Sequence, residues 1–189
     1  HAARRLTAYG VRRGATVAMT MRGGRGQVVL IHAPMKTGSI LLPVSPRLSD
    51  DERSRALKQC RVSIDLDEPD RLTRTEADMP LLGEHDMEDI HCRILTSGSS
   101  GAAHAVGLTY GNHLFSAMGS AFNIGVIPED RWLCALPVSH ISGLSIVMRS
   151  VIYGTTMVLQ DRFETEGVRY AIEEQGVTVI SMVSTMLLR

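Results

Sequence analysis

A run of small and hydroxylated residues carries the strongest chemical signal in this sequence. The run is Thr96-Ser97-Gly98-Ser99-Ser100-Gly101, and it directly follows residues 92–95, Cys-Arg-Ile-Leu, which are typical of a buried strand. Glycines allow backbone N–H groups to approach an anion closely, and the hydroxyls add short hydrogen-bond donors. The pattern predicts a loop around a phosphate group, although a plain surface turn rich in Gly and Ser fits the composition equally well.

The loop differs from two well-known phosphate-binding motifs. It lacks the G-K-[ST] ending of a Walker A loop and the G-x-G-x-x-G spacing of a dinucleotide fingerprint. The wider segment 96–106 instead resembles the phosphate loop of the adenylate-forming enzymes, the acyl-CoA synthetases and their relatives, whose pattern runs T-S-G-[ST]-[ST]-G-x-P-K-G-V. A second block, residues 130–144, looks like the next motif of that family, whose histidine lies near the acyl substrate.

Within this family the chain is most similar to the 2-succinylbenzoate-CoA ligases. Residues 108–117, 140–154 and 177–183 carry the similarity, and 12–18 and 46–49 support it more weakly. The resemblance implies an ATP-dependent acid-thiol ligase of menaquinone biosynthesis that uses ATP, Mg²⁺ and coenzyme A with an aromatic or other carboxylic acid. The family's ribose-binding aspartate and catalytic lysine would lie outside this chain. We therefore expect an N-terminal portion that is inactive by itself.

The resemblance also implies roles for individual residues. ATP phosphates would be bound by Thr96, Ser97, Gly98, Ser99, Ser100, Gly101 and His104, and the acyl substrate by His140, Ser142 and Gly143. His140 follows a predicted strand that ends before Pro137, and open α/β sheets bind ligands at that end of their strands. Judged on the residues alone, a histidine that merely caps the next helix or satisfies loop carbonyls is the commoner case.

The loop departs from the family pattern in its charge. Ala103 and His104 stand where the family usually carries proline and lysine. A charge-assisted hydrogen bond contributes roughly 1.5–3 kcal/mol, so the missing lysine would weaken polyphosphate binding about ten- to a hundredfold. Because a free histidine side chain has a pKa of about 6.5, a histidine replaces that charge only in part at neutral pH. We hypothesise weakened, pH-sensitive ATP binding.

Three functions therefore remain open. The first is a CoA ligase acting on 2-succinylbenzoate. The second is a non-catalytic nucleotide- or acid-binding module, which the missing loop lysine favours. The third is another adenylate-forming enzyme, such as a fatty-acyl-CoA ligase or a carrier-protein-loading domain.

Composition narrows the classes of protein and partner. The chain has 189 residues, is 44% hydrophobic and 21% charged, and contains 20 basic and 20 acidic residues, which gives no electrostatic case for a nucleic-acid partner. No apolar run approaches the roughly 20 residues of a membrane span, so we expect a cytoplasmic protein. Cys60, Cys92 and Cys134 lack C-x-x-C spacing, which predicts reduced thiols and no protein-bound structural metal. The sequence makes no prediction about oligomeric state.

Short apolar runs alternate with amphipathic segments, a pattern that predicts an α/β fold of layered, parallel-rich sheets flanked by helices. Strands are expected at 16–21, 39–44, 61–66, 92–96, 106–109, 131–136, 155–159 and 177–183. Helices are expected at 2–9, 27–36, 50–59, 110–122, 144–153 and 165–174, the third beginning with a capping box between Ser49 and Glu52. The acidic, aperiodic stretch 65–91 predicts a linker between a first subdomain, 1–64, and a phosphate-loop and acyl-pocket subdomain, 92–189.

Overall fold

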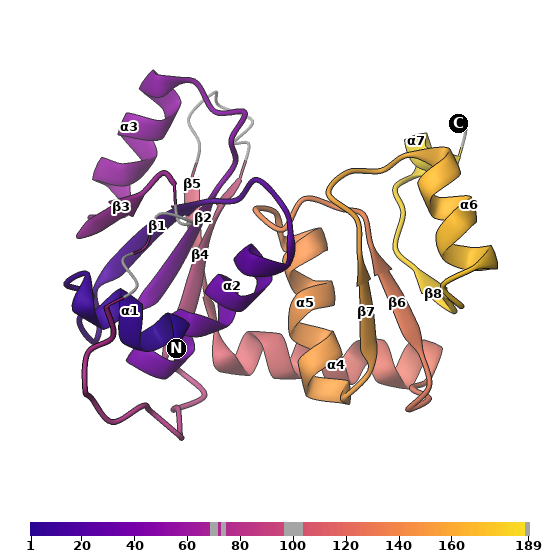
Figure 1. Cartoon of the computed structure of the whole chain (residues 1–189), viewed down its shortest axis with the longest axis horizontal. Coiled ribbons are helices and arrows are strands. Elements are labelled where there is room, and N and C mark those ends of the chain that lie inside the picture. The colour runs from indigo at the N-terminus through magenta and orange to yellow at the C-terminus, as the bar shows by residue number, and fades with distance from the viewer. Residues whose placement is uncertain (69–71, 73–74, 97–103, 188–189) are drawn as a thin grey trace. The chain divides into compact units, whose positions relative to one another are not determined.

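The computed structural model describes residues 1–68, 72, 75–96 and 104–187. The chain divides into two compact units, His1–Asn112 and His113–Arg189. Each unit contains a sheet of mostly parallel strands with helices packed on it (Figure 1). The predicted α/β fold with parallel-rich sheets flanked by helices is confirmed.

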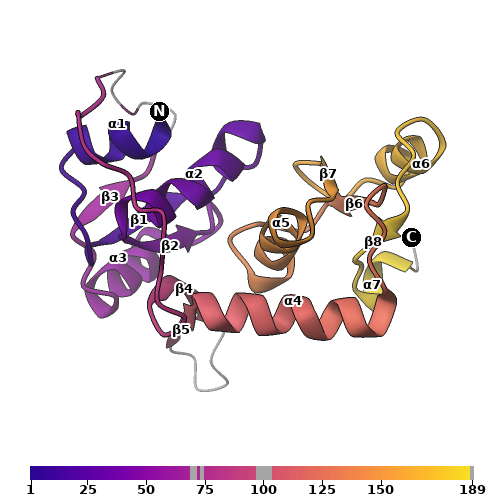
Figure 2. The same cartoon turned by 90° about the horizontal axis from the view of Figure 1, so that it is seen from below.

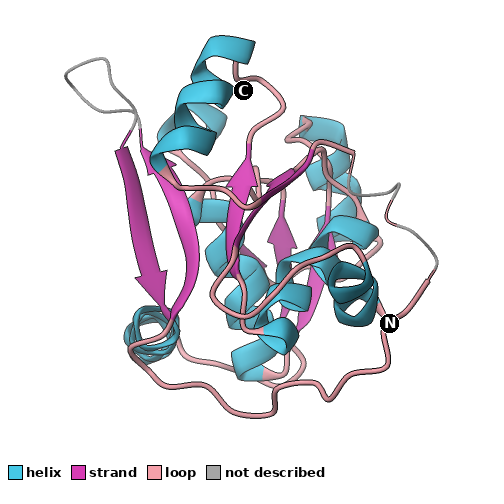
Figure 3. Cartoon of the chain, turned by 90° about the vertical axis from the view of Figure 1, so that its left-hand side faces the viewer, coloured by secondary structure: helices cyan, strands magenta, loops and turns pink. Residues whose placement is uncertain are grey.

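The first unit is built on a five-stranded sheet in the order β3-β1-β2-β4-β5. Its strands are β1 (Thr16–Thr20), β2 (Ile40–Val44), β3 (Ile64–Leu66), β4 (Ile90–Thr96) and β5 (His104–Thr109). All neighbours pair in parallel except β4 and β5, which form an antiparallel hairpin. Figure 3 shows this long hairpin at one edge of the sheet. Every residue of β1 is buried, as expected for a central parallel strand covered on both faces.

Three helices cover this sheet. They are α1 (Ala2–Ala8), α2 (Arg25–Thr37) and α3 (Asp50–Gln59), with α1 and α2 on one face and α3 on the other (Figure 2). Leu57 and Cys60, at the end of α3, pack against Ala18 and Leu42 of the sheet. The predicted capping box at the start of α3 is present, because the backbone N–H of Ser49 donates to the Glu52 carboxylate at 2.8 Å and the Ser49 hydroxyl accepts from the backbone N–H of Glu52.

The second unit holds a three-stranded parallel sheet in the order β7-β6-β8. Its elements are α4 (Tyr110–Ile124), which begins in the first unit, then β6 (Arg131–Cys134), α5 (Ile141–Tyr153), β7 (Thr156–Leu159), α6 (Thr165–Glu173), β8 (Val179–Ile180) and α7 (Ser184–Leu187). Helix α6 packs on one face of the sheet, where Val168 and Ala171 contact the cluster around Leu133, and α5 lies on the other face (Figure 2).

Side chains of α5 hold α4 within the second unit. The Tyr153 hydroxyl donates to the carbonyl of Ala117 at 2.5 Å, and the Arg149 guanidinium donates to the Ser116 hydroxyl at 3.2 Å. The same guanidinium lies 5.6 Å from the ring centre of Trp132 in β6, a cation–π arrangement. One helix turn of α5 thus connects the central strand with α4.

Strand ends differ from the sequence expectations, although the elements themselves are present. Strand β6 stops at Cys134 rather than 136, because the chain turns at Pro137 to enter α5. The predicted strand 177–183 contains only β8, because Val179 and Ile180 alone pair with β6. Strand β5 begins at His104, two residues earlier than expected, because pairing with β4 extends to Thr96.

The stretch from 67 to 89 contains no helix or strand among its described residues, as expected of the acidic segment. Backbone hydrogen bonds attach it to the rest of the first unit: the N–H groups of Ala77 and Leu82 donate to the carbonyls of Arg4 and Lys36, and the carbonyls of Met87 and Asp89 accept from Gly111 and Tyr110. The domain boundaries at 64/65 and 91/92 remain a prediction, although strand pairing places β4 and β5 in the same sheet as β1 to β3. Across the described part of the chain, every helix is too short or too polar to span a membrane.

Candidate functional site

The predicted phosphate loop connects the two strands of the β4–β5 hairpin. Thr96 ends β4 and His104 begins β5, and the two residues are directly opposite each other in the antiparallel register. The Thr96 hydroxyl donates to the His104 carbonyl at 3.1 Å. Residues 97–101 of the predicted site, Ser97, Gly98, Ser99, Ser100 and Gly101, lie outside the described residues. The structure therefore places both flanks of the loop and confirms the expected strand-to-strand connection.

The hairpin is exposed at the end that carries the loop, and its strand β4 is anchored to neighbouring elements. Thr96 and His104 are both exposed, so both side chains are accessible to a ligand at the loop. Three residues before Thr96 in β4, the Arg93 guanidinium donates to the Thr16 hydroxyl at 2.6 Å and to the Cys60 carbonyl at 2.9 Å. Arg93 thereby fixes the hairpin strand to β1 and to the end of α3. A rigid sheet of this kind can hold a loop in one position relative to a ligand.

The second predicted segment lies where β6 leads into α5. His140 is the N-cap residue of α5, and its backbone N–H donates to the Pro137 carbonyl at 3.1 Å. Its imidazole makes no capping hydrogen bond and is exposed. Capping by the side chain, one of the alternatives for this histidine, is therefore absent. The ring is accessible at the carboxyl end of β6, the end at which parallel α/β sheets bind ligands.

Ser142 and Gly143 differ from each other in what they offer a ligand. Ser142 is half-buried, and its carbonyl accepts a hydrogen bond from the Ser145 hydroxyl at 3.0 Å. Gly143 is buried, and a Cβ added to it would lie 2.5 Å from the carbonyl oxygens of both Leu136 and Pro137. This glycine allows the first turn of α5 to pack directly on the segment that follows β6. A steric role explains it without a ligand.

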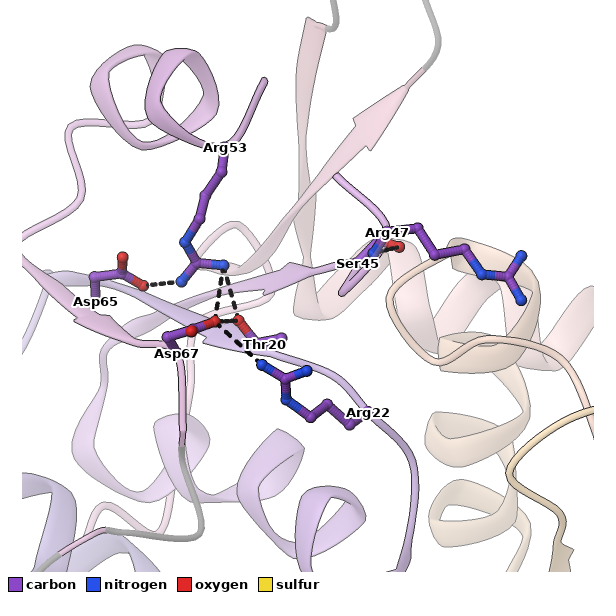
Figure 4. A network of polar contacts seen from close by, with 7 residues as sticks. All are labelled: Thr20, Arg22, Ser45, Arg47, Arg53, Asp65 and Asp67. Carbon is purple, nitrogen blue, oxygen red and sulfur yellow. Dashed lines mark hydrogen bonds and ion pairs between the residues drawn. The ribbon is translucent and has the colours of Figure 1, made fainter. Parts of the chain in front are cut away.

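The structure also contains a polar network that the sequence did not predict, at the carboxyl ends of β1 and β3 (Figure 4). Arg53 of α3 makes an ion pair with Asp65, and its second terminal nitrogen donates to the Thr20 hydroxyl at 2.8 Å. Thr20 in turn donates to Asp67 at 2.6 Å. That hydrogen bond, followed by the charges of Arg53 and Arg22, lowers the pKa of the Asp67 carboxyl.

This network holds α3 against the sheet. Arg47 follows β2, its backbone N–H donates to the Ser45 hydroxyl at 3.3 Å, and its side chain points away from the network (Figure 4). The neighbouring pocket of about 320 Å³ is lined by Asp65, Asp67 and Glu68 together with Tyr9, Leu66 and Leu72. Its charged lining residues are all acidic, and the two aspartates already pair with Arg22 and Arg53. In the sequence, Asp65 and Asp67 look like the start of the acidic linker. Only their ion pairs with Arg53 show that they help to hold α3 against the sheet.

The three cysteines are free and buried. Burial raises the pKa of the Cys92 thiol to about 12 and that of Cys134 to about 11. Both thiols are therefore protonated at neutral pH. Since the thiolate is the reactive and metal-binding form, neither residue is poised as a nucleophile.

Comparison with known proteins agrees with the resemblance read from the sequence. A family model described as AMP-binding enzyme matches residues 1–83 and 65–189. A 2-succinylbenzoate–CoA ligase of Bacillus licheniformis is 35% identical over 98% of this chain and 42% of its own length. The o-succinylbenzoate CoA synthetase of Bacillus subtilis, solved in complex with the acyl-adenylate intermediate, superposes with a TM-score of 0.94 at 35% identity, covering 99% of this chain and 54% of that chain.

The same Bacillus subtilis synthetase in complex with ATP and magnesium ion gives a TM-score of 0.91 at 34% identity, over 99% of this chain and 55% of that chain. This chain thus corresponds to an N-terminal portion of such relatives and spans about two fifths to a little over half of their length. The predicted similarity to 2-succinylbenzoate-CoA ligases is confirmed. Because the two matched segments, 1–83 and 65–189, together cover the chain, this chain belongs to the AMP-binding enzyme family.

Proposed function

We propose that this chain forms the phosphate-binding and acid-binding portion of an ATP-dependent 2-succinylbenzoate–CoA ligase. The observation that carries the proposal is the likeness to the Bacillus subtilis synthetase bound to its acyl-adenylate, at a TM-score of 0.94 over 99% of this chain. The exposed hairpin flanks Thr96 and His104 and the exposed imidazole of His140 are consistent with it. A cytoplasmic location, expected from the composition, and a small-molecule acid as partner belong to the same proposal.

The proposed reaction has two steps. A carboxylate oxygen of the acid attacks the α-phosphorus of ATP, the bond to the bridging oxygen breaks, and pyrophosphate leaves. The thiolate of coenzyme A then attacks the acyl carbon, and AMP leaves. Magnesium would enter with ATP, bound largely by phosphate oxygens and water.

The residues of this chain would serve the first step. Thr96, whose hydroxyl would turn from the His104 carbonyl to the ligand, and the serines and glycines that follow it would donate hydrogen bonds to the β- and γ-phosphates, stabilising the charge that moves onto pyrophosphate. His104 would add a further donor at the base of the hairpin. His140 and Ser142 would contact the acid, while Gly143 would contribute through the close packing of α5.

Pyrophosphate release tests this proposal against the alternatives. The chain is joined to the part of the Bacillus subtilis synthetase that follows the matched region, and release is measured with 2-succinylbenzoate, a long-chain fatty acid and an amino acid. The proposal expects release with 2-succinylbenzoate and a strong reduction in His140→Ala. Preferential release with the fatty acid would favour a different adenylate-forming enzyme, and a folded protein that releases no pyrophosphate with any of the acids would favour the non-catalytic module.

A further inference from the structure

A small pocket lies at the amino ends of the parallel strands in the first unit. Its volume is about 130 Å³, and Ile40 and Ile90, the first residues of β2 and β4, are among its lining residues. The predicted phosphate loop follows the opposite end of β4, because Thr96 is the last of the seven residues of this strand, roughly 20 Å from Ile90 in an extended chain. The pocket is therefore separate from the proposed phosphate site.

The apolar wall of the pocket is held in place by the end of α2. Leu82 lines the pocket, its backbone N–H donates to the Lys36 carbonyl at 3.0 Å, and the Lys36 ammonium donates to the Leu82 carbonyl at 3.2 Å. Leu82 also lies close to Gly38, where an added Cβ would be 2.7 Å from the Leu82 Cδ1. Ile40 and Ile90 begin two paired strands of one sheet. The pocket is thus largely pre-formed, as small-molecule sites usually are.

Two aromatic rings complete the wall. His85 and Tyr110 line the pocket and stack on each other, with ring centres 4.1 Å apart and ring planes at 16°. Burial lowers the pKa of His85, and burial, followed by the charge of Asp89, raises the pKa of Tyr110 to about 12. Both rings are therefore uncharged at neutral pH, which leaves Arg13 and Asp89 as the charged residues among those that line the pocket.

Arg13 and Asp89 carry opposite charges and do not pair with each other. Neither side chain makes an ion pair with any residue that the structure describes. Both residues are exposed, and backbone hydrogen bonds fix the chain at each of them. The N–H of Asp89 donates to the Asp86 carbonyl at 3.1 Å, and the N–H of Gly14, next to Arg13, donates to the Gly38 carbonyl at 2.8 Å. A ligand that carries both a carboxylate and an ammonium group would satisfy the two opposite charges beside this apolar pocket.

We propose that this pocket binds a small α-amino acid with an apolar side chain. Arg13 pairs with the carboxylate of the ligand, and Asp89 pairs with its ammonium group. The side chain of the ligand lies against Ile40, Leu82 and Ile90. Apolar cavities of about 150 Å³ hold one benzene molecule, so this pocket has room for roughly six to eight non-hydrogen atoms, the size range from alanine to valine. ATP and 2-succinylbenzoate are larger, so the site is independent of the proposed ligase reaction.

Calorimetric titration with matched ligands tests the proposal. This chain is titrated with L-valine, with isovalerate, which lacks the ammonium group, and with isobutylamine, which lacks the carboxylate. Arg13→Gln and Asp89→Asn each remove one charge from the pocket. Arg12→Gln and Asp86→Asn are the matched controls, because these exposed neighbours are not among the residues that line it. His140→Ala reports on binding at the proposed acid site, and circular dichroism shows whether each variant is folded.

The proposal expects saturable binding of valine by the wild type. Binding is expected to be at least tenfold weaker for each analogue, and for valine with Arg13→Gln or Asp89→Asn, because each change removes one charged contact. The two control variants and His140→Ala are expected to bind valine as the wild type does. No valine binding by the folded wild type, or an analogue that binds as tightly as valine, would overturn the proposal. Equal losses in the pocket variants and their controls would also overturn it, as would a loss confined to His140→Ala, which would place the amino acid at the proposed acid site.

Discussion

At the scale of single residues, the proposed phosphate site depends on how much charge the hairpin offers an anion. Thr96 and His104 face each other at the base of the hairpin, and His104 stands where relatives with the family pattern carry lysine. A lysine is a fixed positive charge at neutral pH, whereas a histidine is mostly neutral there. The affinity for polyphosphate should therefore respond strongly to this one side chain.

Replacing His104 by lysine tests this dependence. His104→Lys is expected to tighten Mg-ATP binding about tenfold to a hundredfold, the equivalent of one charge-assisted hydrogen bond. Isothermal titration calorimetry measures the change, and Val29→Lys is the control because it adds the same charge at an exposed position on α2. Equal tightening in both variants would show a general charge effect, and no tightening in His104→Lys would place the phosphates elsewhere.

A buried histidine gives a prediction about stability and pH. Burial lowers the pKa of His113 to about 4, below the value of about 6.5 expected in the unfolded chain. The unfolded state therefore binds this proton first, and folding stability falls as the pH drops from 6.5 toward 4, by about 3 kcal/mol in total. Urea unfolding at several pH values should show that decline in the wild type and a shallower one in His113→Gln. Parallel pH profiles for the two proteins would contradict the assignment.

At the scale of elements, periodicity in the sequence predicted which helices and strands exist, and local chemistry predicted one of their starts. The capping box at Ser49 involves only residues three positions apart, so the sequence alone predicted it. The short length of β8 and the pairing of Arg53 with Asp65 depend on partners far away in the chain, so no local pattern revealed them. Among the predicted site residues, the position of His140 after a strand could be predicted from the sequence. The steric role of Gly143 could not, because it depends on the path of the backbone around Pro137.

Gly143 of α5 and Gly119 of α4, two of the glycines in helices of the second unit, make a matched pair of variants. Gly143→Ala would push a methyl group to 2.5 Å from two carbonyl oxygens, and we expect it to lower the free energy of unfolding by about 2 kcal/mol or more. Gly119→Ala meets nothing and is expected to raise helix stability by roughly 0.5–1 kcal/mol. Denaturant unfolding of both variants measures the difference. Similar effects in the two would contradict the close packing of α5 on the segment after β6.

At the scale of the whole molecule, the chain corresponds to less than half of the Bacillus licheniformis ligase by length. The family's catalytic lysine and ribose-binding aspartate are predicted to lie outside this chain, so its proposed part in the reaction is to bind phosphates and acid. The chain alone should therefore bind Mg-ATP without releasing pyrophosphate when 2-succinylbenzoate is added. A coupled pyrophosphate assay checks this, and turnover by the chain alone would show that its own residues complete the reaction.

Calorimetric titration of this chain with Mg-ATP tests the central claim most directly, when it is repeated with Ser99→Ala/Ser100→Ala and with Ser63→Ala as a control outside the proposed site. The proposal predicts saturable binding by the wild type and by Ser63→Ala, and binding at least tenfold weaker in the double variant, because two hydroxyl donors to phosphate are lost. Wild-type binding that is absent, or that the double variant retains unchanged, would contradict a working phosphate loop at 96–101.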